Sequence, residues 1–447
     1  MSQEKQTASK KLSLLDLLSL AGGQIIGAGV MTLLGIGIGF TGRSIIFAML
    51  IAAVLTVFSS VPQLLLAGTA SFPGGYYTMF ATLCNKQLAG IYTYVNLFMI
   101  LGMSFYALSF TSYFLSLFPG ANEVAVCVVV LTVLLVMHLV GVKQAARLQT
   151  VMMVVLLAAL VLYIVMGMGS LEPNYFDPDQ FMTGGAMGFI LACVFLTFAV
   201  GGGTFIVSYS SEAKNPQRDI PLAMVISTLL VAVFYAFIAL VAAGTISVAE
   251  AANQPLSVSA AVFMPPAAYT FFVVGGAMFA LLTSMNFSIG NMVLPTMVAC
   301  KDGWLPKFLT KTNKRFGTNH RILMAVYIVA LVPILLGIDM KTAANCTLIL
   351  TFVIFMIAAY AAMRMPKVIP EQWAKSRYHI PTGALNFICI TAIVLLAVSS
   401  CLLIFTSSTA EIVGNILVLA VAGVLGVVVS KRAEVPVLNM SESKEDV

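Results

Sequence analysis

The stretch GGQIIGAGVM, residues 22–31, lies inside an apolar run long enough to form a helix. It holds four glycines, Gly22, Gly23, Gly27 and Gly29. Glycine in a helix interior costs roughly 0.5–1 kcal/mol relative to alanine, because it loses more backbone freedom on folding. A helix that carries this cost is expected either to pack very closely against its neighbours or to be interrupted.

The composition of the whole chain is that of a membrane protein. Of its 447 residues, 60% are hydrophobic and only 9% are charged, and the mean hydropathy is +1.02. A soluble protein has about 25% charged residues. Apolar stretches of about 20 residues recur, the length that a helix needs to cross a hydrocarbon core. Because transmembrane barrels show short alternating segments instead, we predict an all-α polytopic membrane protein.

Twelve transmembrane helices are expected from the apolar runs. They are residues 14–40, 44–68, 88–118, 121–141, 148–168, 184–210, 220–244, 267–298, 321–338, 342–363, 382–406 and 411–430. The first run is too long for a signal-peptide core, and we expect it to be retained. Residues 1–11 are expected to form an N-terminal tail, and the polar residues 431–447 a disordered C-terminal tail.

The basic residues predict the orientation of these spans. If residues 1–11 lie in the cytosol, only Arg43 and Lys341 of the 23 basic residues fall outside, whereas the outer loops carry Glu172 and Glu250. This is the asymmetry of the positive-inside rule. We therefore expect both termini on the cytosolic side of the cell membrane. The net charge of +6 needs no nucleic-acid partner.

A second glycine cluster interrupts the sixth span, FLTFAVGGGTFIVSYSSE, residues 195–212. Spans one and six are five apart, so the clusters enter the membrane from opposite sides, the pattern of an inverted-repeat transporter. Unpaired backbone persists at this depth only where it lines a cavity. Its N–H groups suit a carboxylate and its carbonyls an ammonium, as in an amino acid. Close packing is the alternative role, and we expect it for Gly35, Gly37 and Gly39.

Four segments resemble the amino acid–polyamine–organocation (APC) superfamily, and they occur in the family's order. GQIIGAGV, from Gly23, is similar to the family's unwound first helix, and SFPGGYYTMF, from Ser71, to the segment after helix two. SEAKNPQRDIPLAMVIS, from Ser211, resembles the loop between helices six and seven, and CKDGWLPKFL, from Cys300, the segment after helix eight. The resemblance implies an amino acid permease or exchanger.

The fold that this resemblance implies is of the leucine-transporter type, a 5+5 inverted repeat with helices 1 and 6 unwound at mid-membrane. Residues 12–170 would form the first repeat, 171–364 the second, and 365–430 the peripheral helices 11 and 12. The substrate would lie between helices 1 and 6. The residues implied to bind it are Ile25, Gly27, Ala28, Gly29, Phe198, Gly201, Gly202 and Gly203.

Three of these positions have individual roles in the resemblance. Phe198 falls where relatives carry an aromatic gate, although an aromatic in a membrane helix also serves packing alone. Gly202 falls on the family's unwinding glycine. Gly203 replaces a second aromatic, so the site is expected to be larger or looser than in those relatives.

The spans around this site lack charged residues in their central parts. Ionisable residues inside a membrane mark charge recognition or proton relay. Their absence from the sequence of these spans favours a neutral amino acid as the substrate. A small or medium side chain is expected rather than a bulky one.

The coupling of transport stays open between exchange, sodium and protons. Proton-coupled relatives often carry a lysine midway along helix 5, where this chain has Leu156 or an apolar neighbour, so exchange is the simplest expectation. Thr283 and Ser284 resemble the hydroxyl pair of sodium-coupled relatives, which makes Na⁺ a possible coupling ion. Their alternative role is bonding back to their own helix. His138 would titrate near neutrality or serve the structure only.

A cluster of charges after helix 6 is a candidate inner gate. Glu212 and Lys214 lie there, and Asp16, at the cytosolic start of span one, is a candidate partner for one of the cations. In the functional interpretation, their ion pairs reorganise as helix 1 moves. In the alternative, they are solvated charges that flank the membrane, and Asp16 is a helix-start charge.

Other classes of function lack their sequence features. The three histidines and seven cysteines show no metal-site spacing, no GxxxxGK[ST] loop is present, and titratable residues do not cluster, so neither a cofactor nor an enzyme is expected. A channel would need a polar pore lining. A non-transporting amino-acid sensor on the same fold is the remaining rival. No cysteine is predicted in an outer loop, so no disulfide-linked heavy subunit is expected, and the oligomeric state is open.

Overall fold

The computed structural model describes residues 12–72, 74–140, 142–210, 213–313 and 316–434, and these residues form helices without a β-sheet. The α-helices are α1 (Leu14–Ile25), α2 (Ala28–Met31), α3 (Leu33–Thr41), α4 (Ile45–Thr69), α5 (Tyr76–Leu83), α6 (Lys86–Met99), α7 (Met103–Leu117), α8 (Glu123–Val140), α9 (Val142–Met168), α10 (Pro178–Phe181), α11 (Gly185–Val200), α12 (Pro216–Gly244), α13 (Val248–Ala251), α14 (Leu256–Phe263), α15 (Pro266–Phe271), α16 (Phe279–Lys301), α17 (His320–Leu335), α18 (Met340–Val368), α19 (Pro370–Lys375), α20 (Thr382–Thr406) and α21 (Thr409–Val429). Short 3-10 segments are η1 (Gly42–Ser44), η2 (Ile100–Gly102), η3 (Gly201–Tyr209) and η5 (Lys307–Thr310), and η4 (Phe272–Met278) is a π-helical turn.

The predicted spans agree with these helices. In the described part of the chain, eleven helical stretches are long and apolar enough to cross a membrane, and α17 is a shorter apolar helix. The predicted spans 184–210 and 382–406, for example, are helical over Gly185–Tyr209 and Thr382–Thr406. The first two predicted spans meet at the turn η1. The prediction of an all-α membrane protein with twelve helices is confirmed.

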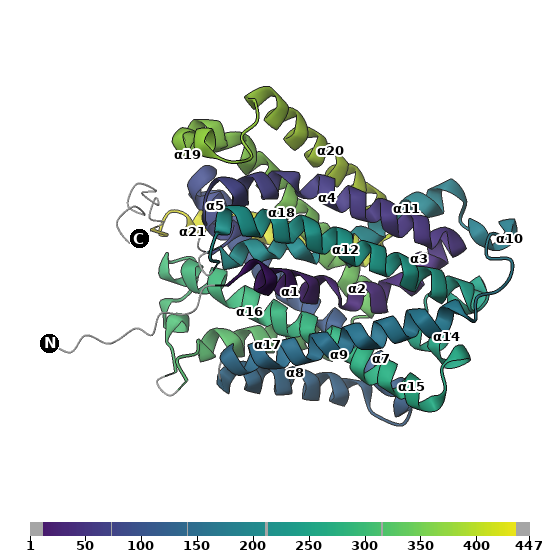
Figure 1. Cartoon of the computed structure of the whole chain (residues 1–447). Helices are drawn as coiled ribbons and strands as arrows, with labels where there is room; N and C mark the ends of the chain where they lie inside the picture. The colour runs from purple at the N-terminus through teal and green to yellow at the C-terminus, as the bar shows by residue number, and fades with distance from the viewer. Residues whose placement is uncertain (1–11, 73, 141, 211–212, 314–315, 435–447) are drawn as a thin grey trace.

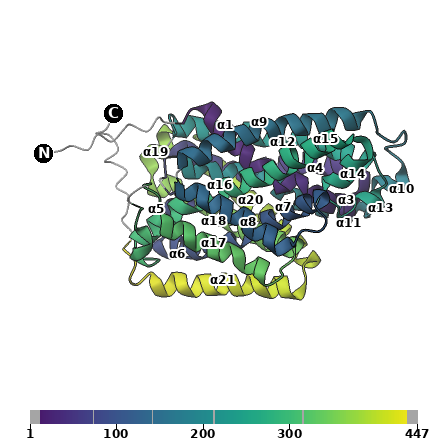
Figure 2. The same ribbon diagram turned by 90° about the horizontal axis from the view of Figure 1, so that it is seen from below.

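The helices pack side by side in one bundle, with α20 and α21 at its edges (Figures 1 and 2). Large apolar side chains point outward from these two helices: Phe387 is 71% exposed and Phe405 86% on α20, and Val424 is 62% exposed on α21. Apolar surface of this extent requires an apolar surrounding, which a bilayer supplies. The assignment of residues 365–430 to peripheral helices stays a prediction.

Helix 1 and helix 6 are both interrupted, and they pack against each other at the centre of the bundle. Helix 1 consists of α1, α2 and α3, and helix 6 consists of α11 followed by η3. α1 contacts η3, and α2 contacts α11, while α12 and α16 pack against α1. The boundaries of the two five-helix repeats, 12–170 and 171–364, remain predictions.

The chain after α21 is ordered for a few residues. Arg432 N–H donates to Val429 O at 2.9 Å, and Glu434 N–H donates to Asp302 O at 3.0 Å. Residues up to 434, which were expected to begin a disordered tail, therefore turn back onto the end of α16. Residues 435–447 lie outside the described part.

Candidate functional site

The first interruption lies at Ile26 and Gly27, between α1 and α2. Ile26 N–H still donates to Gly22 O at 2.8 Å, but the backbone of Ile26 leaves the helical conformation, with ψ 87°. A new helical turn starts at Ala28. Because the first N–H groups of a helix have no intrahelical acceptor, the chain presents polar backbone at the break.

Close packing explains why the break is built from glycine. A Cβ on Gly27 would lie 1.8 Å from Ser284 Oγ of α16, and a Cβ on Gly29 would lie 2.5 Å from the Cα of Ala199 in α11. Neither distance leaves room for a side chain. The glycines of this stretch therefore serve both expected roles, interruption and close approach of neighbouring helices.

The second interruption has a different form. α11 ends at Val200, and residues 201–209 continue as the 3-10 helix η3, so helix 6 tightens here instead of opening into extended backbone. A 3-10 stretch within a longer helix has poorer hydrogen-bond geometry and often marks a hinge. A Cβ on Gly202 would lie 2.9 Å from Cγ of Gln24, and a Cβ on Gly203 3.2 Å from Cδ1 of Ile25. The two interruptions therefore touch.

Two buried tyrosines bind carbonyl groups beside the first break. The Tyr235 hydroxyl of α12 donates to Ile25 O at 2.7 Å. The Tyr113 hydroxyl of α7 donates to Met31 O and accepts the N–H of Leu256 at 3.0 Å. Neither tyrosine was predicted, because hydropathy does not show which distant carbonyl a tyrosine in a membrane helix will meet.

A cavity of about 50 Å³ lies at the two interruptions, several times the ~10–15 Å³ that one water molecule needs. Five of the predicted residues line it: Ile25, Gly29, Phe198, Gly201 and Gly202. The structure places two others outside the lining, since Gly27 packs against Ser284 and Gly203 against Ile25. The side chain of Ala28 lies outside the described part.

Other helices also contribute to the lining of this cavity. Thr56 and Ser59 come from α4, Tyr106 from α7, and Phe352 and Phe355 from α18. None of them was predicted, because the length of an apolar run gives the position of a helix but not the face that it turns to a cavity. Among the described residues that line the cavity, none is charged.

Thr283 and Ser284, both fully buried in α16, have different surroundings. Thr283 Oγ1 donates to Ala280 O at 2.8 Å, on its own helix. Ser284 Oγ faces Gly27 and has no hydrogen-bond partner within the described residues. Of the predicted hydroxyl pair, Thr283 donates its proton to its own helix, whereas Ser284 makes no hydrogen bond within the described residues.

Helix 5, which is α9, contacts helix 1 through an amide. Gln149 Oε1 accepts a hydrogen bond from Asn286 Nδ2 of α16 at 2.8 Å, and its Nε2 would lie 2.9 Å from a Cβ on Gly23. Asn286 also interacts with His138 of α8. Leu156, where we looked for the family's lysine, is buried in the hydrophobic core. Gln149, which reaches helix 1 from the described part of helix 5, is therefore a neutral polar group.

The N-terminal end of helix 1, where the inner gate was predicted, is held by a backbone hydrogen bond. Lys214 N–H donates to Leu12 O at 2.9 Å, which joins the start of helix 1 to the segment after helix 6. The Lys214 side chain is exposed. The Asp16 carboxylate caps α1, where it accepts hydrogen bonds from the N–H and Oγ of Ser13 at 2.8 and 2.7 Å. Glu212 lies outside the described residues.

The segments after helices 2 and 8, which both carried the resemblance, meet on the same side of the bundle. The Tyr77 hydroxyl donates to the Asp302 carboxylate, and the Tyr94 hydroxyl donates to Trp304 O at 2.9 Å. Burial raises the pKa of Asp302, and the hydrogen bond from Tyr77 acts against this rise. These contacts fix the loop after α16 to α5 and α6.

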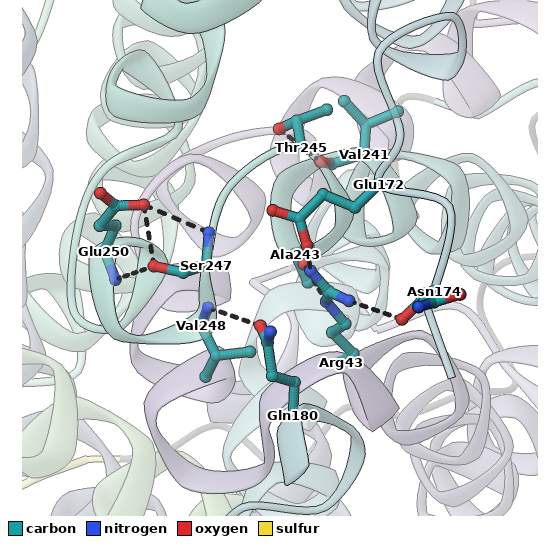
Figure 3. Close-up of polar contacts among 10 residues, drawn as sticks. All are labelled: Arg43, Glu172, Asn174, Gln180, Val241, Ala243, Thr245, Ser247, Val248 and Glu250. Carbon is teal, nitrogen blue, oxygen red and sulfur yellow. Dashed lines mark hydrogen bonds and ion pairs between the residues drawn. The ribbon is translucent and has the colours of Figure 1, made fainter. Parts of the chain in front are cut away.

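The C-terminal end of helix 1 is held by Arg43, whose polar contacts are drawn in Figure 3. Its side chain is only 1% exposed. Its Nε donates to Ala243 O at 3.0 Å, its Nη1 donates to Asn174 O at 2.9 Å, and its Nη2 pairs with the Glu172 carboxylate. The guanidinium group also lies 5.7 Å from the centre of the Tyr175 ring. Arg43 was expected in an outer loop, and nothing in the surrounding sequence predicted that its side chain would be buried.

The similarity to known proteins extends over nearly the whole chain. A sequence profile described as amino acid permease matches residues 12–430. The methylthioribose transporter of Bacillus subtilis is 24% identical over 400 residues, 85% of this chain and 85% of that protein. The branched-chain amino acid permease BcaP of Bacillus subtilis is 23% identical over 392 residues, 82% and 83% of the two chains. The human cystine/glutamate transporter is 26% identical over 344 residues, 73% and 67%. This chain belongs to the amino acid permease family and, with it, to the APC superfamily.

Proposed function

We propose that this protein is a secondary transporter that moves neutral amino acids across the cell membrane by alternating access, and that it works as an exchanger. The observation that carries the proposal is the cavity at the two interrupted helices, whose described lining residues include no charge. A substrate side chain with a charge would lack a fixed partner there. The substrate leaves unchanged, so the protein acts as a transporter and not as an enzyme.

The contacts at the two ends of helix 1 support alternating access. The break at Gly27 separates α1 from the outer half of the helix, so α1 can swing while α2 and α3 stay in place. The Leu12–Lys214 backbone contact then closes the cytosolic side, and Arg43 holds the outer half. Both termini are proposed to be cytosolic, in agreement with the distribution of basic residues.

The relatives support an amino acid as the substrate. Two of them are named for branched-chain amino acids and for cystine and glutamate, and a third for methylthioribose. Because these substrates differ, the choice of a neutral amino acid rests on the uncharged lining of the cavity and not on the names.

Exchange is proposed because helix 5 reaches helix 1 with the neutral amide of Gln149, which does not take up a proton as an amine would. Sodium coupling is the second candidate, and one observation favours it. Ser284 Oγ is buried at the break without a hydrogen-bond partner in the described part of the chain, and hydroxyl oxygens are ligands that hard cations accept.

Uptake by the purified protein in liposomes tests the proposal. Labelled alanine, leucine, lysine and glutamate are offered to vesicles that are empty or loaded with leucine, with and without a sodium or proton gradient. We expect uptake of the neutral amino acids into loaded vesicles only, independent of either gradient. Sodium-dependent uptake into empty vesicles that is lost in Ser284→Ala would establish symport instead. Substrate binding without any uptake would favour a sensor.

A further inference from the structure

We propose that a groove between α8 and α17 binds one anionic phospholipid, whose phosphate group lies at Arg321 and whose acyl chain lies along α8. The two helices pack side by side (Figures 1 and 2). Among the described residues, none lines both this groove and the cavity at the interrupted helices. The inference therefore goes beyond the proposed function and does not depend on which substrate is transported.

One end of the groove is a pocket of about 530 Å³ beside the last turn of α8 and the first turn of α17. Its polar wall includes Asn313, His320 and Arg321, and its apolar wall includes Val136 and Val140 of α8 and Met324 of α17. Arg321 carries a fixed positive charge, and none of the described lining residues is acidic. The pocket therefore suits an anionic group that is attached to an apolar one.

The side chain of Arg321 is held in place, but its charge is not neutralised. Its Nη1 donates to Phe308 O at 3.0 Å, and the guanidinium group lies 5.7 Å from the centre of the Phe308 ring. No carboxylate in the described part of the chain forms an ion pair with it. A guanidinium group has five N–H donors and binds phosphate with two of them at once. Donors of Arg321 therefore remain for a phosphate group.

The start of α17 adds to this attraction for an anion. The side chain of its N-cap residue, Asn319, makes no cap hydrogen bond. The first N–H groups of a helix lack acceptors within the helix, and the helix dipole favours negative charge at that end. The sequence from Lys301 to Arg321 also holds six basic residues and one acidic residue, Asp302. Basic clusters of this kind next to a membrane helix attract anionic lipids.

The groove continues along α8 as an apolar strip. A second pocket, of about 370 Å³, is lined by residues of α8 between Val128 and Met137, and Val136 belongs to both pockets. The polar group in the described lining of this second pocket, Thr132 Oγ1, is already hydrogen-bonded to Tyr327 Oη at 2.8 Å. The strip from Val140 to Val128 is about 18 Å long, comparable with the ~15 Å of hydrocarbon in one leaflet. This length fits an acyl chain whose headgroup lies at Arg321.

The short length of α17 places Arg321 at the level of the lipid headgroups. α17 has 16 residues, about 24 Å of helix, whereas the hydrocarbon core is about 30 Å thick. A span that is too short is accommodated by thinning of the bilayer around it and by long side chains that reach the headgroups. Arg321, in the first turn of α17, therefore meets lipid phosphate.

Hydrogen bonds between α8 and α17 form the groove in advance of binding. Thr318 Oγ1 donates to Leu139 O at 3.1 Å beside the charged end, and Thr132 bonds Tyr327 in the apolar part. Asn313 N–H donates to Thr318 O at 2.8 Å, which closes the loop before α17. A preformed site loses less freedom when a ligand binds.

Lipid binding to the purified protein in detergent tests the inference. Native mass spectrometry gives the apparent Kd of phosphatidylglycerol and of phosphatidylcholine with the same acyl chains. We expect phosphatidylglycerol to bind about fivefold more tightly, because it has no choline cation to oppose Arg321. Arg321→Gln should abolish this preference, and Arg321→Lys should keep most of it. Val136→Trp, which fills the groove from an exposed position, should weaken both lipids.

Lys307→Gln is the control, because Lys307 is exposed in the same basic segment and does not line the groove. It should leave the preference for phosphatidylglycerol unchanged. Equal affinities of the two lipids for the natural protein, or an equal loss of preference in Lys307→Gln and Arg321→Gln, would overturn the headgroup site. If Arg321→Gln does not fold, unchanged binding of both lipids to Val136→Trp would still overturn the groove.

Glycerol 3-phosphate, which has the phosphate group without acyl chains, distinguishes a lipid from a free anion. It should not displace phosphatidylglycerol at equal concentration, because it gains nothing from the apolar strip. Displacement at equal concentration would overturn the lipid and identify a site for soluble phosphate compounds. These measurements need no transport, so failure of the proposed function and failure of this inference are separate results.

Discussion

At the scale of single residues, the glycines of the first helix are explained by what lies beside them. A Cβ on Gly29 would lie 2.5 Å from the Cα and 2.9 Å from the carbonyl oxygen of Ala199. These are backbone atoms of another interrupted helix, so they cannot rotate away as a flexible side chain would. A Cβ on Gly423 of α21, by contrast, would have no other atom within 4 Å.

The two glycines give a matched pair of substitutions. Gly29→Ala should lower the free energy of unfolding by about 1–3 kcal/mol through overpacking and should abolish exchange, because it separates helices 1 and 6. Gly423→Ala should stabilise the protein by up to about 1 kcal/mol, as alanine does inside a helix. Melting temperature in detergent and leucine exchange in liposomes measure both effects. Equal melting temperatures for the two variants would show that the backbone of Ala199 leaves room for a side chain at position 29.

At the scale of helices, the sequence predicted where each helix lies along the chain, but it did not predict which residues of different helices meet. The ends of the predicted spans lie close to the observed ones because burial in lipid requires an apolar run of fixed length. The two interruptions were predicted because a cluster of glycines destabilises a continuous helix. Ile25, Phe198 and Gly202, predicted from these clusters, line the cavity. Gln24 and Phe355 also line the cavity but were not predicted, because their position there depends on the rotation of one helix against another, which hydropathy does not encode.

Tyr235 of α12 makes a contact between helices that hydropathy does not predict, and the role of its hydroxyl is testable. Tyr235→Phe removes the hydroxyl that donates to Ile25 O at the end of α1, and a buried carbonyl left without a donor costs about 1–3 kcal/mol. We expect a lower melting temperature and, because the freed carbonyl borders the cavity, a changed apparent affinity for leucine. Thermal unfolding measures the melting temperature, and exchange kinetics measure the apparent affinity.

Tyr163→Phe is the control for this change. Tyr163 is equally buried, but its hydroxyl bonds Ser259 Oγ of α14 at 2.6 Å and not a carbonyl of helix 1. The control should lower the melting temperature while the affinity for leucine stays as it was. If both variants shift the affinity alike, the bond to Ile25 has no special link to the site.

At the scale of the whole molecule, the two ends of helix 1 are bound to the rest of the protein by different contacts. The N-terminal end has the backbone bond between Leu12 and Lys214. The C-terminal end has the buried Arg43, which joins the end of helix 1 to the segment between helices 5 and 6 and to the end of α12 (Figure 3). This asymmetry suits a fold in which α1 moves and the outer half of helix 1 stays with its neighbours.

Arg43→Lys tests that asymmetry, because a single ammonium cannot reproduce the three directed bonds of a guanidinium. Each carbonyl left without its donor costs about 1–3 kcal/mol, so we expect a clear fall in melting temperature and a slower exchange rate. Glu172→Gln should cost less, since the Glu172 side chain is 42% exposed and water screens its charge. Glu250→Gln is the control on the same face, where the carboxylate caps α13 through Ser247 and does not reach Arg43. An Arg43→Lys protein that melts and exchanges like Glu250→Gln would mean that the outer end of helix 1 is held by packing alone.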